Sequence, residues 1–213
     1  MIRNIIFDLG GVVVTLAPEQ AAERFEALGV QNAAERLNSY TQQGIFGELE
    51  NGLISDEEFR QELISMVGHD VTHAQCAYAW QGYAKEVPAR NLDALIRLRL
   101  MGYRLILLSN TNPYMMEWVG SEAFDGRGHS VSHYFDALYL SYQMKLMKPS
   151  EEIFRRMLMS EQMLPSECLF IDDGARNVAA ASQIGMHTLC PENGADWTAT
   201  LFEFLNEENK KQI

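Results

Sequence analysis

Short runs of apolar residues recur along the chain at intervals that predict a parallel sheet. The runs that we expect to form strands cover residues 5–7, 104–108, 137–140, 168–171 and 186–189. They are rich in large aliphatic residues and show little polar alternation, which is typical of strands that are covered on both faces. Val12, Val13 and Val14 lie shortly after the first run and are interpreted as its continuation.

Helical patterns separate most of these runs. Apolar residues at helical spacing predict helices over 88–101, 149–164 and 177–184. Two of these helices stop at a glycine, Gly102 and Gly185, a usual residue at a helix C-terminus. Alternating strands and helices are the pattern of a right-handed parallel α/β fold. The sequence therefore predicts an α/β protein with a three-layer, Rossmann-like core.

The segment between the first strand and the helix over 88–101 has a different pattern. It has little strand character and predicts four helices, over 17–28, 32–42, 56–66 and 73–84. Ser55 and Glu58 have the spacing of a capping box at the start of the third. A segment this long is not expected to be structureless in a compact domain. We therefore expect a core domain of residues 1–16 and 88–213, with residues 17–87 inserted as a four-helix cap domain.

Composition narrows the classes of function. The 213 residues include 29 acidic and 17 basic ones, for a net charge of −12. No basic stripe is available to neutralise a phosphate backbone, so we expect no nucleic-acid partner. There is no run of 18 apolar residues, and Asp8 interrupts the apolar N-terminal stretch, so we expect neither a membrane span nor a signal peptide. The three cysteines show no metal-ligand spacing and are expected to be reduced thiols, so we expect a cytoplasmic protein.

Polar residues follow three of the predicted strands. They are Asp8, Ser109, Asn110, Asp172 and Asp173, with Lys148 just before the helix over 149–164. Ligands bind at the carboxyl ends of strands in open α/β sheets, so we expect these side chains at one edge. Three neighbouring carboxylates repel one another unless a cation neutralises them, and carboxylate oxygens suit Mg²⁺. Ser109, the Asn110 backbone and Lys148 would then bind a phosphoryl group that Asp8 attacks as a nucleophile.

Each of these residues also has an ordinary structural interpretation. Asp8 alone is typical of a turn at a strand end, and Asp172 and Asp173 are typical of a helix N-cap. Lys148 alone is typical of a solvated surface position. Their occurrence together, at successive strand ends, favours a functional site.

Four segments resemble the motifs of a known family. FDLGGVVV, LLSNT, KPSEEIF and FIDDGARN are similar, in this order, to the four motifs of the haloacid dehalogenase superfamily, in its phosphatase branch with a helical cap inserted after the first strand. Within that branch the chain resembles bacterial sugar-phosphate phosphatases, including the α-glucose-1-phosphate phosphatase type. The resemblance runs across nearly the whole chain.

The resemblance implies a role for each matching residue. It makes Asp8 the nucleophile and a metal ligand, and Ser109 the phosphate-binding serine. Lys148 matches the lysine that binds phosphate. The acidic pair falls on Asp172 and Asp173, of which Asp173 would bind Mg²⁺ directly and Asp172 through water.

One departure from the family's pattern concerns the leaving group. Most members of the phosphatase branch carry an aspartate two positions after the nucleophile, where it protonates the leaving group. This chain has Gly10 there, whose carbonyl can still bind the metal. A positioned general acid typically contributes ~10²–10⁴-fold to the rate, so a replacement is expected. Glu48 and Glu50 are candidates from the cap.

A second departure concerns the phosphate lysine. Relatives commonly have glycine three residues before it, where this chain has Lys145. Both lysines are therefore candidates. We favour Lys148, because Pro149 is expected to start a helix whose N-terminus helps to hold an anion.

The sequence thus predicts a Mg²⁺-dependent phosphatase of a small phosphomonoester, a sugar phosphate in particular, with a phospho-aspartyl intermediate. Two alternatives stay open, a metal-independent dehalogenase that uses the same aspartate and a non-catalytic protein that binds a phosphorylated metabolite. The expected partner is a small phosphorylated molecule. The substrate and the oligomeric state are left open, a monomer being compatible. Trp80 and Tyr83 fit either a sugar site or packing within the cap.

Overall fold

The structure, a computed structural model, describes residues 1–37 and 44–210. Within these residues five parallel strands form one sheet, in the order β5-β4-β1-β6-β7. The strands are β1 (Asn4–Phe7), β4 (Arg104–Ser109), β5 (Ala137–Leu140), β6 (Cys168–Ile171) and β7 (His187–Leu189). The apolar runs predicted each of them, so the parallel sheet is confirmed.

The central strand, β1, sets the register of the sheet. Its last residue, Phe7, lies opposite Leu107 of β4 and Ile171 of β6. The residues that follow these strands therefore emerge at one edge of the sheet. In a parallel sheet this carboxyl edge is where ligands bind. Asp8 and Asp172 both emerge there.

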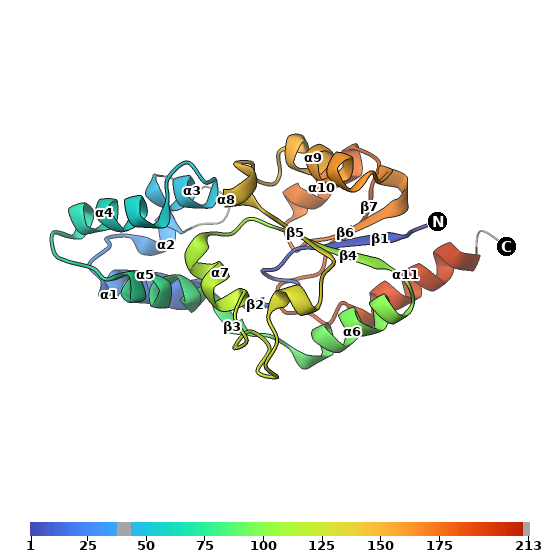
Figure 1. The fold of residues 1–213 in the computed structure, drawn as a ribbon, viewed down its shortest axis with the longest axis horizontal. Coiled ribbons are helices and arrows are strands. Elements are labelled where there is room, and N and C mark those ends of the chain that lie inside the picture. The colour runs from blue at the N-terminus through green and yellow to red at the C-terminus, as the bar shows by residue number, and fades with distance from the viewer. Residues whose placement is uncertain (38–43, 211–213) are drawn as a thin grey trace.

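Helices cover both faces of the sheet (Figure 1). On one face lie α6 (Ala89–Leu100) and α11 (Thr198–Lys210), and on the other lie α9 (Glu151–Glu161) and α10 (Ala175–Gln183). Of these helices, α11 has no counterpart among the predicted elements. The resulting three layers confirm the predicted α/β core.

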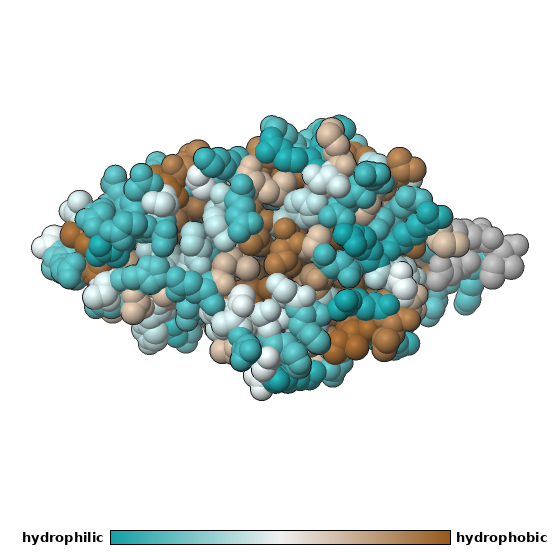
Figure 2. All heavy atoms as spheres, viewed as in Figure 1, coloured by the Kyte–Doolittle hydropathy of each residue, from teal (hydrophilic) through white to brown (hydrophobic). Residues whose placement is uncertain are grey.

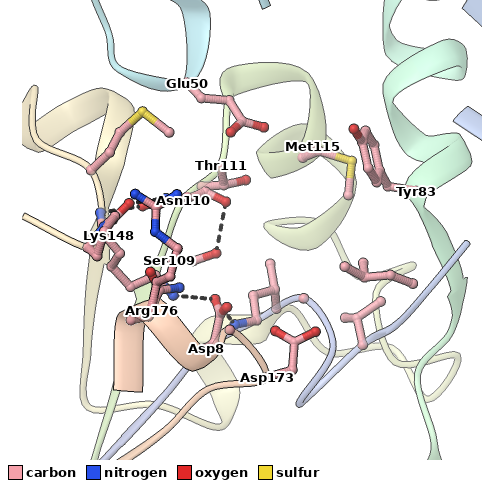
Figure 3. A pocket seen from close by; sticks show the side chains of 18 of the residues that line it. Asp8, Glu50, Tyr83, Ser109, Asn110, Thr111, Met115, Lys148, Asp173 and Arg176 are labelled. Atoms are coloured by element: carbon pink, nitrogen blue, oxygen red, sulfur yellow. Dashed lines mark hydrogen bonds and ion pairs between the residues drawn. The ribbon is translucent and has the colours of Figure 1, made fainter. Parts of the chain in front are cut away.

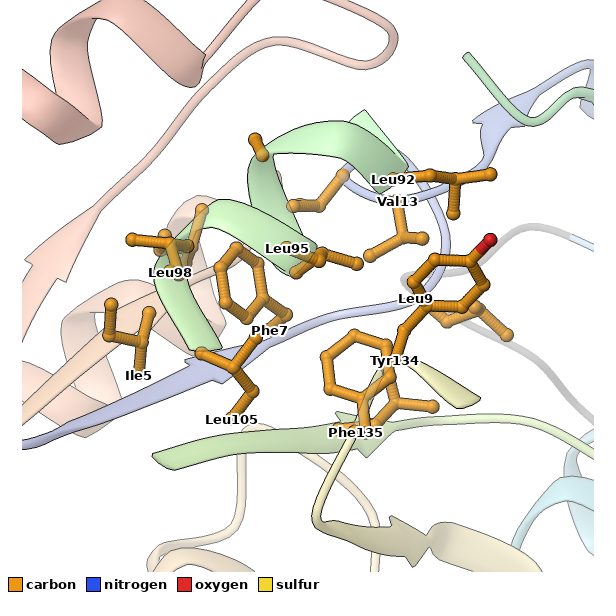
Figure 4. Close-up of a cluster of buried hydrophobic side chains, with 14 of the residues drawn as sticks. Ile5, Phe7, Leu9, Val13, Leu92, Leu95, Leu98, Leu105, Tyr134 and Phe135 are labelled. Carbon is orange, nitrogen blue, oxygen red and sulfur yellow. The ribbon is translucent and has the colours of Figure 1, made fainter. Parts of the chain in front are cut away.

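The two apolar layers use alternate residues of the same strands, because successive side chains point to opposite faces. Ile5 and Phe7 of β1 pack toward α6 and α11, whereas Ile6 packs toward α9 and α10. Figure 4 shows the first layer, with Phe7 and Leu105 of the sheet facing Leu95 of α6. These side chains are fully buried, which explains why the strands show no polar alternation.

A second group of helices lies beyond the carboxyl edge of the sheet, at the left of Figure 1. In the described ranges it comprises α1 (Pro18–Ala27), α2 (Ala33–Arg36), α3 (Ile45–Glu50), α4 (Asp56–Val67) and α5 (His73–Trp80). The sequence predicted four helices here, and α3 is the additional one. Of the predicted helix over 32–42, residues 38–42 lie outside the described residues. That residues 17–87 form a separate cap domain stays a prediction.

These helices pack on an aromatic cluster of their own. Phe25, Phe46 and Trp80 are fully buried, with ring centroids 5.1 to 5.8 Å apart. Tyr114, from α7 (Pro113–Val119), adds to the cluster. Because α7 follows β4 in the chain, it joins the aromatic cluster to the sheet. The sequence did not predict α7.

The predicted helix over 73–84 is wrong in its last turn. α5 ends at Trp80, and a 3-10 turn (Gln81–Tyr83) leads into β3 (Ala84–Glu86). This strand pairs antiparallel with β2 (Thr15–Leu16) in a two-stranded ribbon. Pairing with a segment distant in sequence takes the backbone out of the helix, and no local pattern reports it. The ribbon coincides with the boundaries predicted between core and cap.

Val12, Val13 and Val14 do not continue strand β1, contrary to the prediction. They belong to a tight turn in which the N–H groups of Val13 and Val14 donate to the carbonyl of Leu9, at 3.0 and 2.8 Å. Gly11 has a φ of 76°, which glycine adopts without strain. The valine side chains are only 0–1% exposed. The apolar pattern therefore reported burial correctly and the secondary structure incorrectly.

The helix expected to start at Pro149 begins at Glu151 instead. Ser150 is its N-cap, and the Ser150 side chain accepts a hydrogen bond from the N–H of Glu152. Pro149 therefore does not start the helix, contrary to the prediction, and the role of this helix N-terminus in holding an anion stays a prediction. A short helix just upstream, α8 (Ser141–Met144), was not predicted.

The surface is mainly polar on the face shown in Figure 2. A brown area lies over α6, where Ile96 and Leu100 are exposed. None of the described helices combines the length and apolar character needed to cross a membrane. The three cysteines are free, with Cys76 and Cys168 buried and Cys190 exposed.

Candidate active site

A cavity of about 490 Å³ opens at the carboxyl edge of the sheet, where the strand ends meet the helices beyond them (Figure 3). Its polar lining residues are Asp8, Glu50, Ser109, Asn110, Thr111, Lys148, Asp173, Arg176 and Asn177. Gly10 also lines it, together with apolar and aromatic residues that include Leu16, Trp80, Tyr83, Met115 and Met147. The structure therefore brings the predicted site residues together, with Asp172 at the edge of the group.

Lys148 lies at the centre of the charged residues. Its Nζ atom is 2.9 Å from Asp8 Oδ1 and 2.6 Å from Asp172 Oδ2. The Lys148 side chain is fully buried, which is rare for a lysine unless it is paired. Lys145 is exposed and is not among the residues that line the cavity. The geometry thus favours Lys148, for a reason other than the predicted one.

The loop after β4 holds Lys148 in place. The Asn110 side chain donates from Nδ2 to the Lys148 carbonyl at 3.0 Å and accepts from the Lys148 N–H at 2.9 Å. These two bonds occupy the amide of Asn110. Ser109 is buried and lines the cavity, where its hydroxyl donates to the Asn110 carbonyl at 3.3 Å. Asn110 therefore positions the lysine, and Ser109 faces the space beside it.

The acidic pair after β6 divides into an anchored and an open carboxylate. Asp172 Oδ1 accepts from the Gly174 N–H at 2.7 Å, and the Asn177 amide reaches both Asp172 oxygens at 3.0 and 3.2 Å. With Lys148 added, the oxygens of Asp172 are well occupied. Asp173 is half-buried and lines the cavity. That Asp173 binds Mg²⁺ directly and Asp172 through water stays a prediction.

Gly11 allows the turn after β1 to approach Asp173. A Cβ atom at Gly11 would lie 2.1 Å from Asp173 Oδ2, much closer than atoms can pack. The positive φ at this residue also disfavours any other side chain. Two independent constraints therefore require glycine here, whereas the sequence indicated only a turn.

Burial is the main influence on the pKa values of these groups. It raises the pKa of Asp8 well above its usual value; Lys148 opposes this rise, and the charges of Asp172 and Asp173 add to it. Burial and the charge of Asp172 raise the pKa of Asp173 to about 6. Burial disfavours the charged form of Lys148, but Asp172 and Asp8 outweigh it, so its pKa is raised. One ammonium group thus faces three carboxyl groups.

A divalent cation would neutralise this excess of negative charge. Asp8, Asp172 and Asp173 each offer a carboxylate oxygen, and the three atoms lie within 4.8 Å of one another. Hard oxygen ligands with positions left for water and phosphate suit Mg²⁺. The donor set fits the predicted ion.

The opposite side of the cavity is formed by helices. Glu50, the last residue of α3, points into the cavity across from Asp8 (Figure 3). The Glu50 carbonyl accepts a hydrogen bond from Ser141 Oγ at 2.6 Å. Ser141 Oγ in turn accepts from the Thr111 N–H at 3.0 Å and lies 3.1 Å from the Thr111 carbonyl. Glu48, the other candidate, is exposed and lies outside the cavity. Of the two candidate glutamates, Glu50 therefore lines the cavity and Glu48 does not.

Comparisons with known proteins test the predicted family over the whole chain. A profile of the haloacid dehalogenase-like hydrolases matches residues 2–185. The chain belongs to this family. It is 44% identical over 206 residues to D-ribitol-5-phosphate phosphatase of Bacteroides thetaiotaomicron, a match that covers 97% of this chain and 100% of that protein. The family and the class of hydrolase predicted from the four motifs are confirmed.

Solved structures of haloacid dehalogenase-like hydrolases superpose closely. A predicted hydrolase of this family from Porphyromonas gingivalis has a TM-score of 0.92 and 44% identity, covering 96% of this chain and 98% of that chain. A family enzyme from Bacteroides thetaiotaomicron, solved with magnesium and inorganic phosphate, has a TM-score of 0.86 and 38% identity. The match covers 94% of this chain and 99% of that chain.

Some residues that line the cavity of this haloacid dehalogenase-like hydrolase were not predicted from the sequence. Arg176 lies within FIDDGARN, at the start of α10, and that position gave a signal that was not used. Met115 and Met147 carried no signal, because their place in the cavity depends on how α7 and the Lys148 loop fold. Ser141, which does not line the cavity but bonds to Glu50 and Thr111, lies outside all four motifs and was not predicted either.

Trp80 and Tyr83 combine the two interpretations offered for them. Both line the cavity. Trp80 is also fully buried in the aromatic cluster, and its ring stacks on Tyr83 with centroids 5.9 Å apart. The Tyr83 hydroxyl donates to the Leu37 carbonyl at 2.7 Å. These residues therefore pack the helices and also form the wall of the cavity.

Proposed function

We propose that the protein is a Mg²⁺-dependent phosphatase of a small polyhydroxylated phosphomonoester and acts through a phospho-aspartyl intermediate on Asp8. The observation that carries this proposal is the meeting of Asp8, Lys148 and the acidic pair at one edge of the sheet, with one ammonium against three carboxyl groups. Such a site has an excess of negative charge that a divalent cation would offset, and an anionic phosphoryl group would increase the need for that cation. The phosphatase and magnesium-bound relatives support it.

Each residue has a distinct task in this proposal. Asp8 attacks phosphorus, and water later releases phosphate and restores the carboxylate. Lys148, fixed by Asn110, neutralises the phosphoryl oxygens, and Ser109 donates a hydrogen bond to them.

The metal site would use the carboxylates of Asp8 and Asp173 and the carbonyl of Gly10, with Asp172 acting indirectly. Bound there, Mg²⁺ supplies positive charge that lowers the repulsion between the phosphate and the carboxylates. Asn177 and the Gly174 N–H keep Asp172 oriented toward this site.

The cavity suits a small organic group with several hydroxyls. Its volume of about 490 Å³ is in the range of small-molecule sites. Glu50 and Arg176 offer a carboxyl group and a guanidinium beyond the carboxylate cluster, and Met115 and Trp80 offer apolar surface. The relative that acts on ribitol 5-phosphate makes a polyol or sugar phosphate the substrate class to test. We propose that the helices of residues 17–87 act as a cap that excludes bulk water.

The test is a phosphate-release assay of the full chain. The panel contains ribitol 5-phosphate, glucose 1-phosphate, other sugar phosphates and nucleotides, each with Mg²⁺ and with excess EDTA. We expect release from a polyol or sugar phosphate with Mg²⁺ and none with EDTA. Halide release from a 2-haloacid in EDTA would instead establish the dehalogenase alternative. Thermal stabilisation by a sugar phosphate without turnover would establish the non-catalytic alternative.

A further inference from the structure

Cleavage of an alkyl phosphate leaves an alkoxide that must gain a proton, and a positioned acid accelerates this step by about 10²–10⁴-fold. In this protein the residue two positions beyond Asp8 is Gly10, which has no side chain to donate one. The space next to it is filled, since a Cβ atom there would lie 2.9 Å from Leu16 Cδ1. The side of the cavity that holds Asp8 therefore supplies no acid at this position.

Among the described residues that line the cavity, the other groups that could donate a proton are unsuited or have another task in the proposed reaction. Lys148 is paired with two aspartates, and the Tyr83 hydroxyl donates to the Leu37 carbonyl. Arg176 does not give up its proton under ordinary conditions. The carboxyl groups after β1 and β6 belong to the proposed metal site. The carboxyl group that lies apart from that site is Glu50.

The position of Glu50 suits a proton donor. Glu50 is only 8% exposed, and its side chain faces the cavity across from Asp8 and Asp173 (Figure 3). Ser141 links its backbone to Thr111, two residues after Ser109, so the end of α3 is held against the loop that would bind the phosphoryl group.

We infer that Glu50 is the general acid and base of the reaction, an inference that rests on the phosphatase activity proposed above. In the first step, Asp8 Oδ bonds to phosphorus and the bond from phosphorus to the ester oxygen breaks. The Glu50 proton passes to that oxygen, and the alcohol leaves neutral. In the second step the Glu50 carboxylate takes a proton from water as the water oxygen bonds to phosphorus. The bond to Asp8 breaks, hydrogen phosphate leaves, and both side chains regain their starting forms.

The test uses Glu50→Gln, which keeps the shape and removes the proton. Glu48→Gln is the matched control, because Glu48 lies on the same helix but is exposed and outside the cavity. Each variant is assayed with ribitol 5-phosphate and with p-nitrophenyl phosphate, whose nitrophenolate leaves without a proton. We expect Glu50→Gln to lower kcat/KM by about 10²–10⁴-fold for ribitol 5-phosphate and by less than about tenfold for p-nitrophenyl phosphate. Glu48→Gln should leave both values unchanged.

A pre-steady-state measurement adds a second readout. If Glu50 also serves the second step, Glu50→Gln should release one equivalent of nitrophenolate in a burst and then turn over slowly, since the phospho-enzyme accumulates. Equal losses of kcat/KM for both substrates, or no loss for ribitol 5-phosphate, would overturn the assignment and leave the phosphatase proposal intact. A wild-type protein that hydrolyses neither substrate would overturn both.

A third variant covers the case in which Glu50→Gln fails to fold, as judged by its thermal melt. Glu50→Asp keeps the acid on a shorter side chain. It should lose more activity toward ribitol 5-phosphate than toward p-nitrophenyl phosphate, because the proton is further from the leaving oxygen. An equal loss for the two substrates would count against the assignment.

Discussion

The two sides of the cavity hold their charged groups in different ways. On the sheet side, the fully buried side chains of Lys148 and Asp172 pair with each other. Asp172 also accepts hydrogen bonds from the Gly174 N–H and the Asn177 amide, and the Lys148 backbone N–H donates to the Asn110 side chain. On the helical side, Glu50 ends a six-residue helix, and the Ser141 hydroxyl links it to the loop after β4. The sheet side concentrates opposing charges, whereas the helical side places Glu50 in the cavity together with aromatic and methionine side chains.

This difference indicates a division of labour. Parallel strands place residues at a common edge with little freedom, which suits groups that must meet around one ion and one phosphoryl group. Short helices joined by loops can change without disturbing the sheet, which suits the part that meets the organic group. Variants on the two sides should therefore differ in how strongly they lower catalytic activity and stability.

The largest expected effect is that of Asp8→Asn. It removes the nucleophile, so activity should fall by about 10³-fold or more. It also removes one of three carboxyl groups that repel one another, so the melting temperature in EDTA should not fall. Initial rates and thermal melts measure the two effects. Activity above a tenth of the wild-type value would contradict the proposed nucleophile.

Lys148→Met should damage both activity and stability. Asp8 and Asp172 would lose their shared cation while buried, and breaking a buried pair in this way costs about 3–5 kcal/mol of the free energy of unfolding. Urea denaturation in EDTA measures this cost. Lys145→Met is the control, since Lys145 is exposed, and it should change stability by less than about 0.5 kcal/mol. Similar losses for both variants would contradict the choice of Lys148.

A smaller effect concerns Mg²⁺ and pH. The pKa of Asp173 rises from 3.8 when unfolded to about 6 when folded, and that of Asp8 is raised as well. Without metal, the folded protein binds protons more tightly than the unfolded chain, so these groups lose stabilising effect as pH rises from about 4 through 6. Mg²⁺ binds the carboxylate forms. The increase in melting temperature caused by Mg²⁺ should therefore be larger at pH 7.5 than at pH 5, and calorimetry at both values tests this.

The smallest expected effect is that of Ser141→Ala, which loosens the link between the two sides. It leaves the buried Thr111 N–H and the Glu50 carbonyl without the Ser141 hydroxyl, a loss of about 1–3 kcal/mol in the free energy of unfolding. Activity should fall less than tenfold. Ser65→Ala is a control, because the exposed Ser65 hydroxyl donates to the Gln61 carbonyl within its own helix, α4. A larger loss of activity than for Lys148→Met would reverse the proposed order of the two sides.

Much of the sheet side could be predicted from the sequence. Buried parallel strands leave continuous apolar runs, and the first polar residue after each run must emerge at the carboxyl edge. Asp8, Ser109 and Asp172 are predictable for this reason. The geometry favours Lys148, but the choice of Lys148 stays a prediction, and Pro149 does not start α9 as expected, because Ser150 is its N-cap.

The helical side depended on the tertiary structure. No periodicity marks α3, and the difference between exposed Glu48 and buried Glu50 follows from how that helix packs. The ribbon of β2 and β3 joins residues some seventy positions apart, and Val12 to Val14 are buried in a turn whose apolar residues look like a strand. Local patterns determined which residues are buried and which strands form the five-stranded sheet, because burial and backbone periodicity act over a few residues. Only the assembled fold decided which side chains face the cavity, because that depends on contacts between distant segments.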